Sequence, residues 1–309
     1  MEFLFFEKEL EALSGKIEKI KTQKSPDLEK LNALEKELNA KTKEIYSNLK
    51  PVEISAIARH PQRPLASDYI NSFVADFQEL AGDRRYGDDK AIISGIGKLG
   101  NESVAIIAQE RGNDIQSRVY RNFGQAKPEG YRKAVRIMKM AEKFDMPVIN
   151  LIDITGAYPG KESEERGIHE AIAKSIQTTL SIEVPVISVI IGEGGSGGAI
   201  AIGAADRVIM LENSIYSVIS AEGASAILWK SRDEKETAAE ALKFTSKDLK
   251  KLGIIDEIVS EGIGGAQRNP QKTIENLRKS LESNLKELNK ISRSKIVKKR
   301  ADKFLDMTI

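Results

Sequence analysis

A run of apolar residues that ends in bare backbone is the feature that most restricts the possible folds of this chain. Residues 184–203 read VPVISVIIGEGGSGGAIAIG, so a β-branched segment is followed by five glycines within seven positions. Short apolar runs rich in Val and Ile are typical of strands that are buried on both faces of a sheet. Glycines directly after such a strand predict a loop that binds a ligand through its backbone N–H groups.

The same module occurs twice in the chain. When Pro147 is aligned with Pro185, MPVINLIDITGA matches VPVISVIIGEGG, and each copy follows a helical pattern. The apolar faces of the two expected helices are Ala134, Ile137, Met138 and Ala141 in the first copy and Ile168, Ile172, Ile176 and Leu180 in the second. A helical crossover joins strands that point the same way, so the repeat predicts two neighbouring parallel strands.

The loops that follow these strands are expected to face one crevice. They are DITGAYPG, residues 153–160, and GEGGSGG, residues 192–198. Parallel strands end at the same carboxyl edge of a sheet, where open α/β sheets bind their ligands. Free backbone N–H groups and the N-terminus of a following helix favour an anion there, so the loops are suited to stabilise negative charge on oxygen.

A dinucleotide-binding fingerprint is an alternative reading of the same glycines. Gly192, Gly194 and Gly197 satisfy G-x-G-x-x-G, and Glu212 lies twenty residues beyond Gly192. However, residues 198–205 leave room for about two helical turns, which is short for a normal crossover of about 10–12 residues. Nicotinamide or flavin binding is therefore disfavoured.

Other polar residues give weaker indications of chemistry. Ser196 could be a nucleophile, although no histidine follows it and a small turn residue is the simpler interpretation. A hydratase is an alternative function for the chain. It would need a pair of carboxylates for acid–base catalysis, for which Glu193 and Glu222 are the candidates. His60 and His169 are too few and too far apart in sequence to predict a metal cluster.

The chain divides into three regions. Residues 1–50 carry a helical stripe through Leu10, Leu13, Ile17 and Ile20, and a second helix is expected to start with Ser25 as N-cap and Pro26 at its first position. Residues 51–268 hold the glycine loops and the strand-like runs KAIISGIGKL, ESVAIIAQE and DRVIML. Residues 269–309 return to a helical stripe and end in the basic segment 293–300, expected to be a solvated helix face.

Composition excludes several classes of protein. The chain has 309 residues, no cysteine and a net charge of +2, which rules out thiolate chemistry and gives no overall bias toward nucleic acid. The N-terminal MEFLFFEKELEAL lacks a basic segment before a long apolar one, so export is not expected. No window approaches the roughly 20 apolar residues of a membrane helix.

Nine ordered blocks between residues 57 and 270 closely resemble the alpha subunit of acetyl-CoA carboxylase carboxyltransferase. They include IARHPQRP, FQELAGDRRYGDDKAI, RNFGQAKPEGYRKAVRIMKMAEKFDMPVI, GAYPG, GEGGSGGAIAIGAADRVIMLENSIYSVISAEGASAILWK and GGAQRNP. The resemblance implies an α/β, crotonase-like fold of repeated β-β-α units, with an N-terminal helical hairpin and a C-terminal helix.

The resemblance also implies an activity and partners. Members of the family transfer a carboxyl group from carboxybiotin, carried by the biotin carboxyl carrier protein, to acetyl-CoA, which gives malonyl-CoA for fatty acid synthesis. The expected partners are a zinc-containing beta subunit in an α2β2 complex, the carrier protein and biotin carboxylase. Carboxybiotin is the co-substrate, no metal is expected in this chain, and the bacterial cytoplasm is favoured over a plastid.

Site residues can be assigned by the same resemblance. The principal donors to the biotin ureido oxygen are Gly197 and Gly198, with Gly156 and Ala157 lining the same site from the other loop. The further residues expected to contact the co-substrate are Gly194, Gly195, Ala199, Tyr158 and Pro159. In this family the proton of the acetyl methyl group is thought to go to biotin, so no general base is expected here.

The chain departs from the family pattern at a few positions. Thr155 and Ala221 replace prolines, Ala224 stands at or near a cysteine, and AQERG at residues 108–112 replaces Gly-His-Gln-Lys-Gly. Three arginines could bind CoA phosphates or the partner subunit, or could be ordinary solvated charges; these are Arg118, Arg121 and Arg132.

Overall fold

A single mixed sheet organises the molecule. The computed structural model describes residues 2–307, in which eight strands join in the order β1-β2-β3-β4-β5-β6-β8, with β7 paired to the end of β5. The strands are β1 (Ala75–Glu79), β2 (Ile92–Leu99), β3 (Glu102–Gln109), β4 (Val148–Ile154), β5 (Val186–Gly195), β6 (Arg207–Leu211), β7 (Ile215–Ser217) and β8 (Glu257–Val259). Pairing is antiparallel from β1 to β3 and parallel from β3 onward.

The sequence repeat sets the register of the two central strands. Val148 pairs with Val186, Ile149 with Ile187 and Asn150 with Ser188, so the two prolines that precede these strands are in register. The prediction of neighbouring parallel strands is therefore confirmed. The register shifts after Ile152, where Ile154 pairs with Gly194, because the two copies diverge as the glycines begin.

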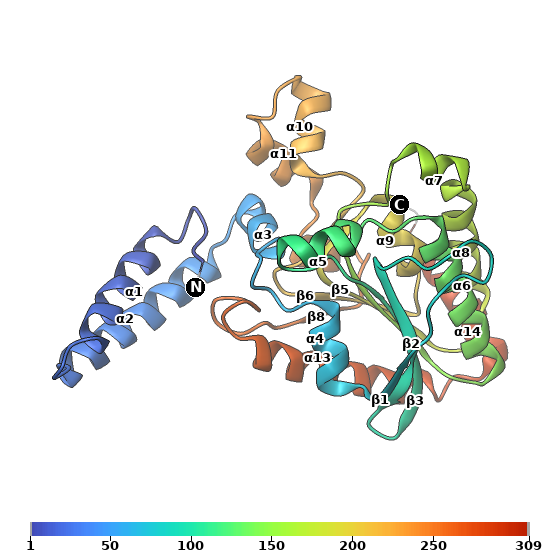
Figure 1. The fold of residues 1–309 in the computed structure, drawn as a ribbon, viewed down its shortest axis with the longest axis horizontal. Helices are drawn as coiled ribbons and strands as arrows, with labels where there is room; N and C mark the ends of the chain where they lie inside the picture. The colour runs from blue at the N-terminus through green and yellow to red at the C-terminus, as the bar shows by residue number, and fades with distance from the viewer. Residues whose placement is uncertain (1, 308–309) are drawn as a thin grey trace.

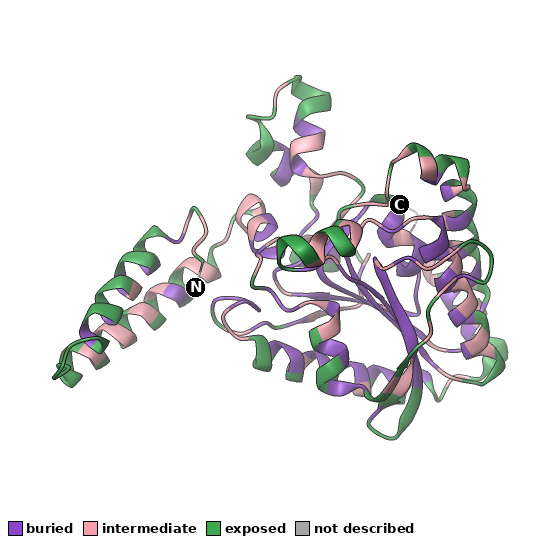
Figure 2. Cartoon of the chain, viewed as in Figure 1, coloured by how far each residue is buried: buried purple, intermediate pink, exposed green. Residues whose placement is uncertain are grey.

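Helices cover both faces of the sheet (Figure 1). One face packs on α6 (Pro128–Lys143), α8 (Ile168–Ser181) and α9 (Ser196–Gly203), and α14 (Arg293–Leu305) lies against α8. The other face packs on α4 (Ala66–Phe73) and α13 (Pro270–Leu288). Because both faces are covered, the strands between them are buried almost throughout, as the burial colours in Figure 2 show.

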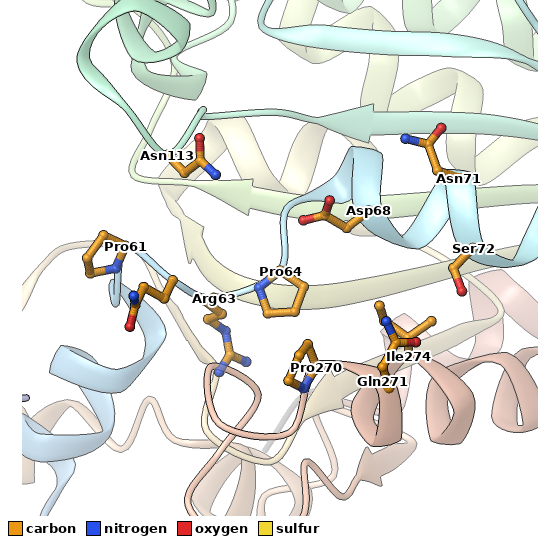
Figure 3. Close-up of a pocket in the computed structure, with 11 residues that line it drawn as sticks. Pro61, Arg63, Pro64, Asp68, Asn71, Ser72, Asn113, Pro270, Gln271 and Ile274 are labelled. Carbon is orange, nitrogen blue, oxygen red and sulfur yellow. The ribbon is translucent and has the colours of Figure 1, made fainter. Parts of the chain in front are cut away.

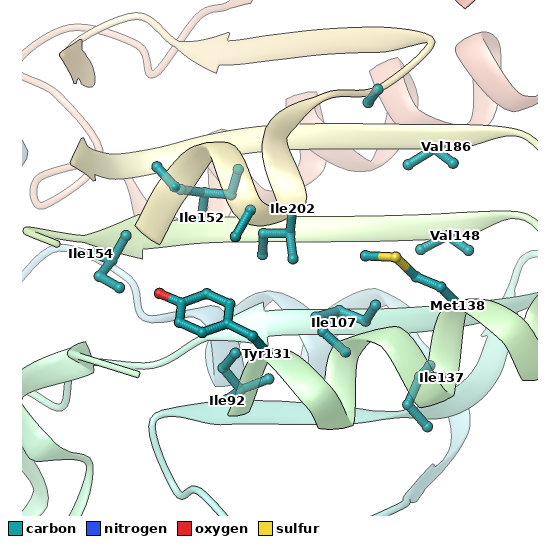
Figure 4. Close-up of a cluster of buried hydrophobic side chains, with 14 of the residues drawn as sticks. Ile92, Ile107, Tyr131, Ile137, Met138, Val148, Ile152, Ile154, Val186 and Ile202 are labelled. Atoms are coloured by element: carbon teal, nitrogen blue, oxygen red, sulfur yellow. The ribbon is translucent and has the colours of Figure 1, made fainter. Parts of the chain in front are cut away.

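Side chains of the central strands alternate between two cores. Val148 and Ile152 of β4 belong to the cluster under α6, α8 and α9, whereas Ile149 and Leu151 belong to the cluster under α4 and α13. Figure 4 shows the first cluster, in which Ile137 and Met138 of α6 point at the sheet. The predicted apolar face of α6 is confirmed, since all four of its residues are buried. The helical stripe expected after residue 269 is also buried on α13, as Ile274, Leu277, Leu281, Leu285 and Leu288.

The predicted face of α8 is partly wrong. Ile168 is buried, but the rest of the buried face consists of the small residues Ala171, Ser175, Thr178 and Thr179. These residues let α8 approach both α6 and α9, and the Ser175 hydroxyl donates a 2.6 Å hydrogen bond to the carbonyl oxygen of Ala201. The larger Ile172, Ile176 and Leu180 lie half-buried at the sides of this contact.

The N-terminal region is a helical hairpin that extends away from the sheet (Figure 1). It consists of α1 (Lys8–Lys21) and α2 (Leu28–Ser47), and the predicted stripe of α1 is buried against α2. The predicted start of α2 is wrong, because Asp27 is the N-cap and its side chain accepts from the Lys30 N–H at 3.0 Å. At the base of the hairpin, Glu7 accepts hydrogen bonds from Tyr46 and Arg268.

The remaining helices connect or project from this core. A short unit of two helices packs on α3 through a small apolar cluster and projects from the molecule (Figure 1). That projecting unit consists of α10 (Ala221–Trp229) and α11 (Lys235–Leu242). The other remaining helices are α3 (Pro51–Ala58), α5 (Ile115–Tyr120), the 3₁₀ helix η1 (Asn122–Gly124), α7 (Lys161–Glu165) and α12 (Ser246–Lys251).

The prediction that the basic C-terminal segment is a solvated helix face is partly wrong, because one of its arginines is buried. Arg300 of α14 is 1 % exposed and donates to both carboxylate oxygens of Asp206, at 2.9 and 2.7 Å. It also donates to the carbonyl oxygens of Thr179, Ile182 and Val184. A guanidinium has five donors in a fixed fork, so one buried arginine can bind the carboxylate and these three carbonyl oxygens together.

Candidate active site

Two chain segments meet at the carboxyl edge of the sheet, one after β4 and one after β5. A methyl group on Gly198 would lie 2.7 Å from the backbone nitrogen of Ala157 and 3.0 Å from the carbonyl carbon of Gly156. A methyl group on Gly195 would overlap the carbonyl oxygen of Thr155. The predicted convergence of the two loops is therefore confirmed, and glycine is required there because backbone packs directly on backbone.

The predicted extent of the second loop is wrong. Strand β5 continues to Gly195, and its last residues pair with β7, Gly194 with Tyr216 and Gly195 with Ser217. Several of these glycines serve packing, because a methyl group on Gly192 would overlap the Asp153 carboxylate and one on Gly194 would lie 2.8 Å from the Tyr216 ring. Within the predicted loop, the residues outside strand β5 are therefore 196–198.

The N-terminus of α9 lies at the junction of the two loops. The helix begins at Ser196, its N-cap Gly195 has no side chain to cap it, and Gly198 is buried against the first loop. The N–H groups of Gly197 and Gly198 belong to the first turn, where no intrahelical acceptor exists, and no acceptor elsewhere in residues 2–307 binds them. The helix dipole adds partial positive charge at this point.

Two buried side chains hold the carbonyl oxygen of Gly198. The Nε2 of Gln109, at the end of β3, donates to it at 2.8 Å, and the Tyr131 hydroxyl of α6 lies 3.5 Å from it. Both side chains have no exposed surface, and burial raises the pKa of Tyr131, so its hydroxyl stays protonated. The Oε1 of Gln109 has no partner among the described residues. These contacts fix the orientation of the first turn of α9.

A buried ion pair supports the end of β4. The carboxylate of Asp153 forms an ion pair with Arg111, whose Nε lies 2.9 Å away, and accepts a hydrogen bond from the Glu193 N–H at 3.0 Å. Burial raises the pKa of Asp153, while Arg111 and the Glu193 N–H act in the opposite direction. Asp153 lies near the end of β4, and its carboxylate accepts a hydrogen bond from the backbone of β5. It therefore sets the spacing of the two strands from which the loops emerge.

The two carboxylates considered for a hydratase are both engaged by one arginine. Arg59 donates to Glu193 at 2.9 and 2.7 Å and to Glu222 at 3.1 Å. Burial acts to raise the pKa of Glu222, but its own backbone N–H and Arg59 lower it overall. A carboxylate that is held ionised by an arginine is a poor general acid, so the arrangement disfavours hydratase chemistry.

Comparison with known proteins identifies the family. Residues 3–308 match the family described as acetyl co-enzyme A carboxylase carboxyltransferase-like. The chain is 48 % identical over 312 residues to the acetyl-coenzyme A carboxylase carboxyl transferase subunit alpha of Cereibacter sphaeroides, covering 99 % of this chain and 98 % of the relative. It is 49 % identical over 305 residues to the subunit of the same name from Halalkalibacterium halodurans, covering 97 % and 94 %. The chain belongs to the acetyl-CoA carboxylase carboxyltransferase family.

Solved structures show the same fold at low sequence identity. The transcarboxylase 12S structure matches with a TM-score of 0.61 at 20 % identity, covering 77 % of this chain and 44 % of that chain. A Pseudomonas malonate decarboxylase hetero-tetramer matches with a TM-score of 0.58 at 18 % identity, covering 70 % and 86 %. The predicted crotonase-like α/β fold and the predicted carboxyltransferase function are confirmed.

Within this family fold, Ser196 stands in an unusual conformation. It lies at the turn from β5 into α9 with φ of 53°, so a strand, a turn and a helix do surround this serine. Neither histidine of the chain pairs with it: His169 pairs with Glu164, and His60 contacts the carbonyl oxygen of Glu2. Ser196 therefore serves the turn, since its left-handed backbone lets α9 start immediately after the strand.

The remaining residues that the resemblance assigned to the site lie on the first loop and on α9. The Tyr158 N–H donates to the carbonyl oxygen of Ala126 at 3.0 Å, and Lys127 Nζ lies 5.0 Å from the Tyr158 ring centre. Pro159 is exposed beside it, and Ala199 is buried in α9. Tyr158 and Pro159 thus lie on the first loop near α6, and Ala199 is packed inside α9.

The three arginines considered for CoA or partner binding lie in different surroundings. Arg132 is bound by Asp83 at 2.8 Å and by the carbonyl oxygen of Arg166 at 3.0 Å. Arg121 donates to the carbonyl oxygen of Lys90, and Arg118 to that of Gly112 at 3.5 Å. Arg118 and Arg121 therefore retain donors at the surface, whereas Arg132 holds the protein together.

Exposed apolar side chains form two groups near the ends of β4 and β5. The 3₁₀ helix η1 lies beside the end of β4, since Gly124 packs on the carbonyl oxygen of Asp153, and β7 leads from the end of β5 to α10. The exposed residues are Ile115, Val119, Tyr120 and Phe123 on α5 and η1, and Val218, Ile227, Leu228 and Trp229 on and before α10. Exposed apolar clusters of this kind are typical of protein contact surfaces.

A hollow away from the two glycine loops has its arginine already paired. A cavity of about 510 Å³ between α4 and the start of α13 is lined by Arg63, Pro64, Asp68 and Pro270, among others (Figure 3). Its arginine is already bound by Glu261 and by the carbonyl oxygen of Ile191. Residues 2–307 contain no group of three potential metal-ligating side chains, and no helix among them has the length and apolar content needed to cross a bilayer.

The supporting residues of the site escaped sequence analysis. Gln109, Arg111 and Tyr131 lie outside both glycine loops, and nothing in their local pattern predicts their contacts with residues that are 89, 42 and 67 positions away, respectively. The available signal was the AQERG segment, which contains Gln109 and Arg111 and departs from the family pattern. The structure shows that this departure lies directly beneath the first turn of α9.

Proposed function

We propose that this chain supplies the carboxybiotin-binding half of a carboxyltransferase active site. The observation that carries the proposal is the first turn of α9, whose Gly197 and Gly198 N–H groups are free and whose Gly198 is wedged against Gly156 and Ala157. A side chain at Gly198 would fill this cradle, so the residues present suit a flat polar group that approaches the backbone. The ureido ring of biotin is such a group.

The chemistry requires stabilisation of negative charge on one oxygen. Carboxybiotin supplies the transferable carboxyl group, and loss of that group leaves negative charge on the ureido oxygen. Gly197 and Gly198 donate to this oxygen, and the N-terminal dipole of α9 adds to the effect. Gln109 and Tyr131 keep the Gly198 peptide oriented, so the donors need no rearrangement during the reaction.

The second half of the site belongs to a partner. The transferred carboxyl group must reach acetyl-CoA, and the described residues of this chain offer no general base at the crevice. Two exposed apolar surfaces, on α5 with η1 and on α10, flank the crevice and suit a beta subunit that covers it. We propose an α2β2 complex with a zinc-containing beta subunit, supplied by biotin carboxylase and the biotin carboxyl carrier protein in the bacterial cytoplasm.

The reverse reaction tests this proposal most directly. Biocytin-dependent decarboxylation of malonyl-CoA is measured with this chain alone and after co-expression with the beta subunit of the same genome. Activity in the co-expressed complex, and none with this chain alone, is the expected result. A folded complex that decarboxylates malonyl-CoA equally well without biocytin, or not at all, would contradict the proposal.

A further inference from the structure

A hollow of about 300 Å³ on the outer side of α6 gathers cationic side chains. It lies between the loop of residues 82–87, α6 and α8, away from the two glycine loops. Its lining residues are Asp83, Arg85, Arg132, Val135, Arg136, Lys139, Glu170 and Lys174. Five of these are cations and two are carboxylates, so the hollow has an excess of positive charge from three separate elements.

Most of these cations have no carboxylate partner. Arg132 is neutralised by Asp83, but Arg85 and Lys139 make no side-chain hydrogen bond or ion pair to any residue between 2 and 307. Lys174 donates to the neutral Gln177. The hollow therefore holds three unpaired cations on its exposed wall, with Glu170 as its remaining carboxylate.

Arg136 is the fourth unpaired cation, and it lies deeper. Its Nε donates to the carbonyl oxygen of Gly82 at 3.0 Å, and its Nη2 donates to those of Leu80 and Ala81 at 2.7 and 3.2 Å. These neutral acceptors leave Nη1 without a partner among the described residues. Burial and the neighbouring Arg84 lower the pKa of Arg136, and the carboxylates of Asp88 and Asp83 offset this only in part, so an additional anion in the hollow would favour its charged form.

We propose that this hollow is a binding site for a small phosphate-bearing anion, held by Arg136 with Arg85, Lys139 and Lys174. Guanidinium forks bind phosphate oxygens bidentately, and lysines add point charges around them. The volume fits a small phosphorylated molecule rather than a single ion. An anion here links the loop of residues 82–87 to α6 and α8.

The site also bears on the crevice through α6. Tyr131, which contacts the carbonyl oxygen of Gly198, lies on the same helix one position before Arg132 and about one turn before Arg136. An anion that ties α6 to its neighbours therefore stabilises the helix that supports the first turn of α9. This inference concerns binding to this chain and does not depend on the proposed carboxyltransferase geometry.

Inorganic pyrophosphate is the probe for the test, with sodium chloride at matched ionic strength as the reference. Thermal unfolding of the full chain should show a saturable rise of Tm with pyrophosphate and none with chloride. Lys139→Gln and Lys174→Gln should each weaken pyrophosphate binding by about tenfold, since each removes one charged hydrogen-bond donor. Arg136→Gln should weaken it further, although this variant also removes contacts to the loop.

Lys143→Gln is the matched control, because Lys143 lies on the same helix but outside the hollow. An equal loss of pyrophosphate binding in this variant, or an equal rise of Tm with chloride, overturns the proposal. Coenzyme A distinguishes the source of the phosphate. Competition between coenzyme A and pyrophosphate, lost in the same variants, assigns the site to the phosphates of the thioester substrate. Binding of pyrophosphate without competition assigns it to a free anion.

Discussion

Gln109 donates a 2.8 Å hydrogen bond from Nε2 to the carbonyl oxygen of Gly198, which ties the end of β3 to the first turn of α9. Both residues are buried, and the two are 89 positions apart in the sequence. The contact is the direct link between the sheet and the free N–H groups of the helix. The position of those donors therefore depends on a residue outside both glycine loops.

Replacement of Gln109 by leucine should lower kcat more than it raises KM. The leucine keeps the volume of the side chain but leaves the Gly198 carbonyl oxygen with the weaker Tyr131 contact, so the donors lose their fixed orientation. Loss of one such buried contact is expected to reduce kcat by about tenfold or more. Steady-state kinetics of the reverse reaction in the complex measures this, and Gln177→Leu on the exposed side of α8 is the control. A normal kcat in Gln109→Leu would show that the hydrogen bond does not position the donors.

Gly198→Ala should nearly abolish transfer. The added methyl group would lie 2.7 Å from the backbone nitrogen of Ala157 and 2.9 Å from the Tyr131 hydroxyl, neither of which can move freely. Activity is expected to fall on the order of 10²-fold, the effect of losing an oxyanion donor. Gly197→Ala should lose less activity, because its methyl group meets a side-chain methyl of Ile172 at 3.9 Å.

A glycine far from the site provides the control for these variants. Gly15 lies on α1 with open space around it, so Gly15→Ala should leave activity unchanged and favour the helix slightly. Biocytin-dependent decarboxylation of malonyl-CoA and the elution volume of the complex are measured for all three variants. Equal activities of Gly197→Ala and Gly198→Ala would contradict the assigned packing.

The centre of the fold could be predicted from the sequence because the helix-strand-loop unit that builds it occurs twice in the chain. The matching Pro147 and Pro185 modules predict parallel strands and their register, and β-branched runs predict strands buried on both faces. The crevice between the loops follows from the same argument, since parallel strands end at one edge. What the repeat could not predict was where β5 ends, because glycine is compatible with both a loop and a strand packed against large neighbours.

Long-range polar contacts were the other part that sequence could not predict. Arg300 lies in a basic run that is typical of a solvated helix face, yet it is buried on Asp206, 94 positions away. Similarly, Arg59 reaches Glu193, 134 positions away. Such pairs depend on tertiary packing and leave no local period, whereas helical stripes and strand alternation do. The family resemblance supplied site residues but not the side chains that position them.

Arg59 joins the sheet to the projecting α10–α11 unit, so its loss should destabilise the chain. In Arg59→Gln the buried Glu193 loses its cation, which is expected to lower the free energy of unfolding by about 3 kcal/mol. Glu222→Gln removes the other, half-exposed end of the bridge and should cost less than about 1 kcal/mol. Urea unfolding at neutral pH measures both, and equal costs would show that Glu193 does not need Arg59.

Asp83 should make the stability of the chain depend on pH in the acidic range. Burial acts to raise the pKa of Asp83, but Arg132 and the backbone N–H groups of residues 85–87 bind its carboxylate and lower the pKa from 3.8 to about 2. A carboxylate with a lowered pKa stabilises the folded state above the pKa of the unfolded chain, and this contribution is lost as the pH falls from about 4 toward 2.

Asp83→Asn isolates this contribution, because asparagine keeps the shape and one acceptor oxygen but not the charge. At pH 7 the variant should be less stable than the wild type by about 1–2 kcal/mol, given about 1.4 kcal/mol for each pKa unit and some screening by solvent. The difference should shrink steadily as the pH is lowered below about 4. Urea unfolding of both proteins between pH 7 and pH 3 measures it. A difference that stays constant over this range would mean that the ionised Asp83 carboxylate contributes no stability through Arg132, and that its role is confined to the turn.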